Sequence, residues 1–213
     1  MQRRIEKKFI VNSISYNNII YLIENRIGFK EIFNERQVNS IYLDDAKLSS
    51  FYANIDGNFY KQKWRLRWYG KTFGENKELN LEQKSKLGMI QFKKNEIISK
   101  SIINENMNLN SFYENLPPKI KNLLIVSFIR YTRRYFANKD MSIRITVDKN
   151  IEYSNINRKK IFRINNPYCD NRIILEMKSS INEEEALNNI CQKLPFRVSK
   201  NSKYINSIIS SHH

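Results

Sequence analysis

Charged and apolar residues alternate along several segments of the chain, the pattern of a β-strand with one polar and one apolar face. The clearest segment is KQKWRLRWY at 61–69, where four cations occupy every second position and Trp64, Leu66 and Trp68 lie between them. The same alternation, with carboxylates among the cations, recurs at 4–9, 78–86, 143–148 and 172–178. Such strands either show their charged faces to water or turn them inward around a charged lumen.

The whole pattern predicts an α+β fold of mainly antiparallel strands. Strands are expected at 3–11, 37–43, 60–70, 77–86, 88–95, 123–137, 141–149, 158–164 and 171–179. Helices are expected from Ser13 or Ser15 to about residue 27, at 47–55, at 182–193 behind an Asn182 cap, and at 201–209. About eight strands suffice to close a tunnel-like β-barrel with appended helices.

An open sheet with one solvated face is the alternative to that barrel. Arginine and lysine dominate strand after strand, and on an open sheet they would repel one another unless an anion lay among them. Four strands also bring a carboxylate close to a cation, in the pairs Glu6 with Lys8, Glu82 with Lys84, Asp148 with Arg144, and Glu176 with Lys178. Carboxylates add nothing to a surface that only binds a polyanion, but a divalent cation bound beside phosphates needs oxygen ligands. A barrel with a charged lumen is therefore favoured.

The amino-acid composition indicates what kind of molecule the protein binds. The chain has 213 residues and a formal net charge of +16, which indicates an anionic partner. It has no repeat or linker, so residues 1–211 are expected to form a single domain, and His212–His213 resemble the remnant of a purification tag. Without that pair there is no histidine, which excludes His-based triads and metal sites and leaves oxygen ligands for Mg²⁺ or Mn²⁺.

The cellular location follows from what the sequence lacks. No apolar run approaches a membrane span, and the N-terminus has no signal-peptide core. Cys169 and Cys191 show no metal-ligand spacing and are expected to be ordinary thiols, with a disulfide left open. These features favour a cytoplasmic protein.

Eight short motifs carry a resemblance to a known family. In sequence order they are RRIEKKF (3–9), VNSIYLDD (38–45), KWRLRWY (63–69), LEQKSK (81–86), YTRRYF (131–136), RITVD (144–148), ILEMK (174–178) and SKNSKY (199–204). This order resembles the VTC domain, the catalytic domain of polyphosphate polymerases within the CYTH or triphosphate tunnel metalloenzyme superfamily. The resemblance covers nearly the whole chain and implies an antiparallel tunnel barrel with an inward charged lining.

The resemblance also implies roles for individual residues. The catalytic cations would be Lys8, Arg65, Arg67, Lys84, Arg133, Arg144, Lys200 and Lys203. Tyr131, Ser202, Lys63, Lys86 and Lys178 would contact the substrate. Glu176 would hold Mn²⁺ or Mg²⁺ on the phosphates, whereas Glu6 would be either a second ligand or only the partner of Lys8 or Arg4.

One departure from the wider superfamily bears on the activity. Many of its triphosphatases begin with Glu-x-Glu-x-Lys, but these positions are Arg4, Glu6 and Lys8 in this chain. An arginine in place of a carboxylate favours binding a growing polyanion, so the expected activity is transfer of the γ-phosphate of ATP to inorganic polyphosphate. A triphosphatase is the first alternative. A non-catalytic nucleic-acid module is the second, although Trp64 and Trp68 lie on the face opposite the cations, which suits base stacking poorly.

Overall fold

The structure is a computed structural model that describes residues 4–12, 14–75, 78–88, 90–99, 102–103, 108–156 and 164–210. The candidate cap Ser13, nearly all of the strand expected at 158–164, and His212–His213 lie outside the described residues. Within the described part of the chain, no helix is long and apolar enough to cross a membrane.

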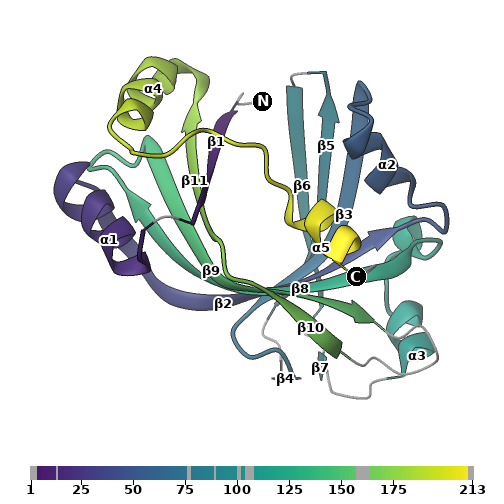
Figure 1. The fold of residues 1–213 in the computed structure, drawn as a ribbon. Helices are drawn as coiled ribbons and strands as arrows, with labels where there is room; N and C mark the ends of the chain where they lie inside the picture. The colour runs from purple at the N-terminus through teal and green to yellow at the C-terminus, as the bar shows by residue number, and fades with distance from the viewer. Residues whose placement is uncertain are drawn as a thin grey trace. The chain divides into compact units, whose positions relative to one another are not determined.

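Most of the described chain is β-strand, as the alternating pattern predicts (Figure 1). The strands are β1 (Arg4–Val11), β2 (Lys30–Asp44), β3 (Tyr60–Tyr69), β4 (Gly74–Glu75), β5 (Leu79–Leu87), β6 (Ile90–Ser99), β7 (Ile102–Ile103), β8 (Leu124–Ala137), β9 (Ile143–Ile156), β10 (Ile164–Asp170) and β11 (Ile173–Ser180). The helices are α1 (Tyr16–Tyr21), which continues as a π-helical turn at Leu22–Arg26, α2 (Ser49–Ile55), α3 (Leu109–Glu114), α4 (Glu184–Gln192) and α5 (Lys203–Ser210).

Nine strands form one sheet in the order β1-β11-β9-β8-β2-β3-β5-β6, with β10 paired to β9. The strand pairs whose register the structure gives are all antiparallel. In the described chain this hydrogen-bonded path has two ends, β1 and β6, so the expected closure into a barrel is not shown. The mainly antiparallel α+β class is confirmed.

Contacts within the chain divide it into two compact units. The first consists of Met1–Arg36, Tyr131–Ile151 and Asp170–Asn201. Helix α1 begins at Ser15, whose hydroxyl accepts the Asn18 backbone N–H at 3.3 Å, which satisfies one of the donors that a helix start leaves open. The apolar faces of the helices and strands form a core that includes Phe9, Ile19, Ile23, Phe136, Val147, Leu175 and Leu187.

The second unit consists of Gln37–Arg130, Glu152–Cys169 and Ser202–His213. Its core is built from the residues that alternate with the cations of β3 and β5, together with α3 and β8. It includes Ile41, Leu43, Leu66, Trp68, Leu79, Leu81, Phe112 and Phe128. Trp68 is fully buried and Trp64 packs against the same core, so the prediction that both tryptophans face away from the cations is confirmed.

Several sequence predictions about element boundaries were wrong. Strand β9 runs to Ile156 rather than to 149, and β6 runs to Ser99 rather than to 95. Strand β2 begins at Lys30, well before the expected residue 37, because its first half is largely exposed and lacks a continuous apolar face. Asn182 does not cap α4, because a 3₁₀ turn at Ile181–Glu183 precedes the helix. The first turn of α4 contains Glu184 and Glu185, whose negative charges suit the helix dipole.

Candidate functional site

The charged face of the second unit is organised around one buried carboxylate, that of Glu82 on β5. Arg65 lies directly opposite on β3, and its Nε donates to Glu82 Oε2 at 2.6 Å. Lys93 Nζ on β6 donates to the other oxygen at 3.3 Å, and Arg67 Nη1 lies 3.8 Å from Oε2. These four residues are called the Glu82 cluster, and together they carry net positive charge.

Electrostatics keeps Glu82 ionised. Burial raises the pKa of this carboxyl, but Arg65, Arg67 and Lys93 more than offset the burial and lower the pKa from 4.5 to about 2. Burial lowers the pKa of Lys93, although Glu82 opposes that shift. At neutral pH the cluster therefore holds an ionised carboxylate that fixes the position of two arginines.

Two tyrosines and a second buried carboxylate support this cluster. The Tyr42 hydroxyl accepts a hydrogen bond from Arg65 Nη1 at 3.0 Å, and the Tyr42 ring stacks on Tyr204 of α5 at 5.1 Å. The Tyr204 hydroxyl donates to Asp44, which also accepts the backbone N–H groups of Ser50 and Phe51 at the start of α2. Through these hydrogen bonds to Asp44, helices α2 and α5 both contact the end of β2.

The C-terminal segment provides a second contact with this charged face. Lys63 Nζ donates to Ser202 Oγ at 3.0 Å and lies 5.6 Å from the centre of the Tyr204 ring. Burial raises the pKa of the Tyr42 phenol, but Arg65 and Arg67, with a smaller contribution from Lys203 at the start of α5, lower it below its ordinary value. Three residues predicted for the site, Lys63, Ser202 and Lys203, thus lie near the Glu82 cluster.

The first unit carries a cluster of alternating charge on β1 and β11. Lys8 lies directly opposite Glu176, and Glu6 lies directly opposite Lys178. Within each strand the same charges also pair, at 2.8 Å between Lys8 Nζ and Glu6 Oε1 and at 2.5 Å between Lys178 Nζ and Glu176 Oε1. These four residues are called the Glu176 cluster.

Glu176 is the buried member of that cluster, with 7% of its surface exposed. Its burial favours the neutral acid, but Lys178, Lys8 and Arg133 hold its pKa well below the ordinary range. Lys8 also donates to the backbone carbonyl of Asn201 at 3.0 Å. The structure therefore gathers Lys8, Glu6, Glu176, Lys178 and Arg133, which the sequence predicted for the site.

Arg133 has a fixed orientation because Asp148 holds it. Its Nε and Nη2 donate to the two carboxylate oxygens of Asp148 at 2.5 and 2.7 Å, and Asp148 is fully buried. The Arg133 guanidinium lies 5.1 Å from the centre of the buried Tyr131 ring. This replaces the expected pairing of Asp148 with Arg144, which is exposed and lies opposite Lys178 on β11.

The remaining predicted residues lie at the margins of the two clusters. Lys84 is exposed and lies opposite both Lys63 and Lys93 in the sheet, and Lys86 lies opposite Lys61. Lys200 is also exposed, between Ser199 and Asn201, which both contact β1. Lys84 and Lys86 thus lie on the charged strand β5, and Lys200 lies in a segment that contacts β1.

Sequence reasoning missed the central role of Glu82 and left Lys93, Tyr42 and Tyr204 out of the site. A signal for Lys93 existed, because antiparallel pairing of the strands expected at 77–86 and 88–95 can bring residue 93 opposite Lys84, as the structure shows. Tyr42 lies in the VNSIYLDD motif and pairs with Arg65 once β2 and β3 are aligned. Tyr204 comes from a distant helix, so local pattern carried no signal for its contact with Asp44.

The donor set limits how a metal ion could be held. No group of three or more Asp, Glu, Cys or His residues in the described chain is arranged to bind a metal. The Glu176 cluster offers the two carboxylates of Glu176 and Glu6 on neighbouring strands. Mg²⁺ commonly binds through one or two carboxylates together with substrate phosphates and water, so these residues fit a metal that arrives with a phosphate ligand.

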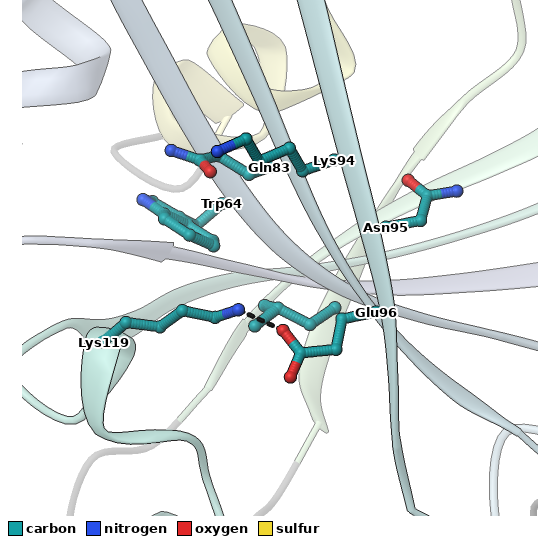
Figure 2. A pocket seen from close by; sticks show the side chains of 7 residues that line it. Trp64, Gln83, Lys94, Asn95, Glu96 and Lys119 are labelled. Atoms are coloured by element: carbon teal, nitrogen blue, oxygen red, sulfur yellow. Dashed lines mark hydrogen bonds and ion pairs between the residues drawn. The ribbon is translucent and has the colours of Figure 1, made fainter.

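A pocket of about 360 Å³ lies on the opposite face of the second unit (Figure 2). Trp64, Gln83 and Lys94 line it, and each of these residues is the sequence neighbour of a member of the Glu82 cluster. On one side Lys119 pairs with Glu96 and lies 6.0 Å from the centre of the Trp64 ring. Because Trp64 and the Lys119–Glu96 ion pair line this pocket, it differs in chemistry from the Glu82 cluster and is not part of it.

Comparison with known proteins gives a family and a fold. The family model of the VTC domain matches residues 3–212. The PH1819 protein of Pyrococcus horikoshii OT3 superposes with a TM-score of 0.54 at 15% identity, covering 98% of this chain and 97% of that one. A Vibrio parahaemolyticus protein provisionally named an adenylate cyclase gives 0.57 at 14% identity, with 97% and 98% covered. The search of curated proteins finds no significant match.

Proposed function

The chain belongs to the VTC domain family, and we propose that it is a polyphosphate polymerase that transfers the γ-phosphate of ATP to a growing inorganic polyphosphate chain. In this reaction the terminal phosphate oxygen of the acceptor forms the new P–O bond. The bond between the γ-phosphorus and the β–γ bridging oxygen breaks, and ADP leaves. The expected closure of the sheet into a tunnel stays a prediction of this proposal.

The observation that carries the proposal is the Glu82 cluster. Two arginines and a lysine meet at one buried carboxylate, so the site keeps net positive charge where charge is screened little by water. A phosphate chain supplies the missing negative charge, and guanidinium groups match phosphate oxygens in shape and charge. Phosphoryl transfer needs mainly positioning and charge stabilisation, which this residue set offers without a histidine or a covalent nucleophile.

The Glu176 cluster of the first unit is proposed to hold the divalent metal that the reaction requires. Glu176 and Glu6 would hold Mn²⁺ or Mg²⁺ on the phosphates, and the metal would neutralise part of the phosphate charge. Lys8 and Lys178 contact these carboxylates and would bind phosphate oxygens beside them. Arg133, which Asp148 holds in one orientation, would stabilise charge on the transferring group.

The direct test is incubation of the purified protein with ATP and Mn²⁺, followed by analysis of both products. A polymerase yields ADP and a long phosphate polymer. Release of orthophosphate without polymer would indicate a triphosphatase on the same fold, and no turnover together with salt-sensitive nucleic-acid binding would indicate a polyanion-binding module. Each alternative thus gives a different product pattern.

Glu176→Gln tests the residue assignment. This change keeps the shape of the side chain and removes its charge, so we expect turnover to fall by about a hundredfold or more while the protein stays folded. Glu152→Gln is the matched control, because Glu152 also pairs with an arginine, Arg130, but lies outside both clusters. Full activity in Glu176→Gln would remove Glu176 from the proposed mechanism.

A further inference from the structure

Phe33, Arg36 and Tyr135 form a contiguous stack on β2 and β8 of the first unit. The Phe33 and Tyr135 rings meet edge to face, with centres 5.8 Å apart and planes at 85°. The Arg36 guanidinium lies 4.7 Å from the Tyr135 ring centre and 5.6 Å from that of Phe33. Arg36 Nε also donates to the Tyr135 hydroxyl at 3.2 Å, which holds the guanidinium in place.

This stack continues into the charged site. The Arg133 guanidinium lies 5.9 Å from the Tyr135 ring centre and 5.1 Å from that of Tyr131. Asp148 holds Arg133 in one orientation through both of its carboxylate oxygens. The Tyr135 ring thus lies within about 6 Å of both Arg36 and Arg133, the group proposed to bind phosphate.

Phe33 presents its aromatic ring to solvent. Its side chain is 55% exposed, whereas Phe9 and Phe136 in the same unit are fully buried. Burial of a phenylalanine ring stabilises a fold, so a ring left in water contributes little to folding. Its ordered contact with a tyrosine and an arginine instead gives it a platform on which a flat ligand can stack.

We infer that the Phe33–Arg36–Tyr135 stack binds the nucleobase of ATP, so that the triphosphate extends from it toward Arg133. This inference rests on the proposed function, because it takes ATP as the phosphoryl donor. Every nucleobase has a π-face, and stacking on aromatic rings and arginine planes tolerates base identity. The site therefore accepts GTP as well as ATP, and it distinguishes a nucleotide from inorganic triphosphate, which has no ring to stack.

The experiment compares two ligands that share the phosphate chain and differ in the base. Calorimetric titration measures the affinity of the full-length protein for ATP and for inorganic tripolyphosphate at one Mg²⁺ concentration. Phe33→Leu keeps an apolar side chain without the aromatic ring, and it should weaken ATP binding by about tenfold while tripolyphosphate binding changes less than about twofold. Phe33→Trp should preserve ATP affinity because it restores a larger stacking surface.

Two further variants separate stacking from other effects. Arg36→Lys keeps the charge but removes the planar guanidinium, so it should also weaken ATP binding more than tripolyphosphate binding. Tyr21→Ala removes a similarly exposed ring, 57% exposed on α1, that has no part in the stack, and should change neither affinity. Thermal unfolding of each variant verifies that the fold is retained.

The possible results distinguish the inference from the function on which it rests. If the unaltered protein binds tripolyphosphate and ATP, but Phe33→Leu leaves ATP affinity unchanged or weakens both ligands equally, the stacking subsite is wrong and the proposed function stands. If the unaltered protein binds neither ligand, both proposals are overturned. Selective loss of ATP affinity in Phe33→Leu and its recovery in Phe33→Trp support the subsite.

Discussion

Replacing Glu82 by glutamine tests whether this carboxylate is the anchor of its cluster. Glu82 is 5% exposed, and its burial raises the carboxyl pKa, but the neighbouring cations lower the pKa from 4.5 to about 2. Because one pKa unit corresponds to about 1.4 kcal/mol, the ionised carboxylate contributes about 3 kcal/mol to the free energy of unfolding at neutral pH. Removing one partner of a buried ion pair typically costs about 3–5 kcal/mol, which agrees in size.

The direction of the pH dependence follows from the lowered pKa. The contribution of Glu82 is fully present above the unfolded-state pKa of 4.5 and is lost as the pH falls from 4.5 through 2. Urea unfolding in phosphate-free buffer should therefore show Glu82→Gln to be about 3 kcal/mol less stable than the unaltered protein near neutral pH. At about pH 3 the difference should shrink to roughly half, because the unfolded-state carboxyl is then protonated.

The control for this experiment is Glu96→Gln. Glu96 lies on β6 like Lys93 and pairs with Lys119, but its side chain is 49% exposed. Exposed ion pairs contribute about 0–1 kcal/mol, so this change should have little effect on stability. A Glu82→Gln protein within about 0.5 kcal/mol of the unaltered one near neutral pH, or a difference that does not depend on pH, would refute the reasoning.

Two further changes test the other buried carboxylates. Tyr204→Phe removes the hydroxyl that donates to Asp44 and should lower the free energy of unfolding by about 1–3 kcal/mol. The control is Tyr52→Phe, which alters an exposed ring and should leave the free energy of unfolding unchanged. Equal effects of the two changes in urea unfolding would argue against the Asp44 contact. Asp148→Asn leaves Arg133 buried without its carboxylate and should lower the free energy of unfolding by about 3–5 kcal/mol. Saturating tripolyphosphate should then raise the melting temperature of this variant more than that of the unaltered protein. An equal rise in both proteins would mean that Arg133 does not bind phosphate.

Strand alternation predicted which face of each strand carries charge, but not which charges pair. The expectation for Glu82 named only Lys84 on the same strand, and the structure shows Glu82 paired with Arg65 on the neighbouring strand. Directly opposite residues have Cβ atoms about 4.5–5.5 Å apart, so Arg65 reaches Glu82 directly across the two strands. Such a pair appears only when the register between two distant segments is known.

The same reasoning explains the other outcomes. Asp148 and Arg144 share a face but lie about 13 Å apart along the strand, too far for an ion pair, so Asp148 is held by Arg133 on another strand. The expected pairs Glu6–Lys8 and Glu176–Lys178 do form, because the long lysine side chain spans two residues along the strand. Local pattern thus identified pairs that a lysine makes along its own strand, but it did not identify the arginine–carboxylate pairs between strands.

That difference divides the buried carboxylates into two kinds with different consequences for chemistry. Asp148 and Glu82 bind arginines, and the guanidinium of Arg133 donates to both oxygens of Asp148. Displacing either carboxylate would therefore leave a buried guanidinium without its counter-charge. Glu176 is paired with Lys178, a point charge on a flexible stem that is itself 38% exposed and can turn toward another anion at little cost. A metal with its phosphates can therefore replace the lysine at Glu176 more cheaply than it can replace the arginine at Asp148 or Glu82. Hence Glu176 is the buried carboxylate best suited to hold the metal, and the other two are best suited to position arginines.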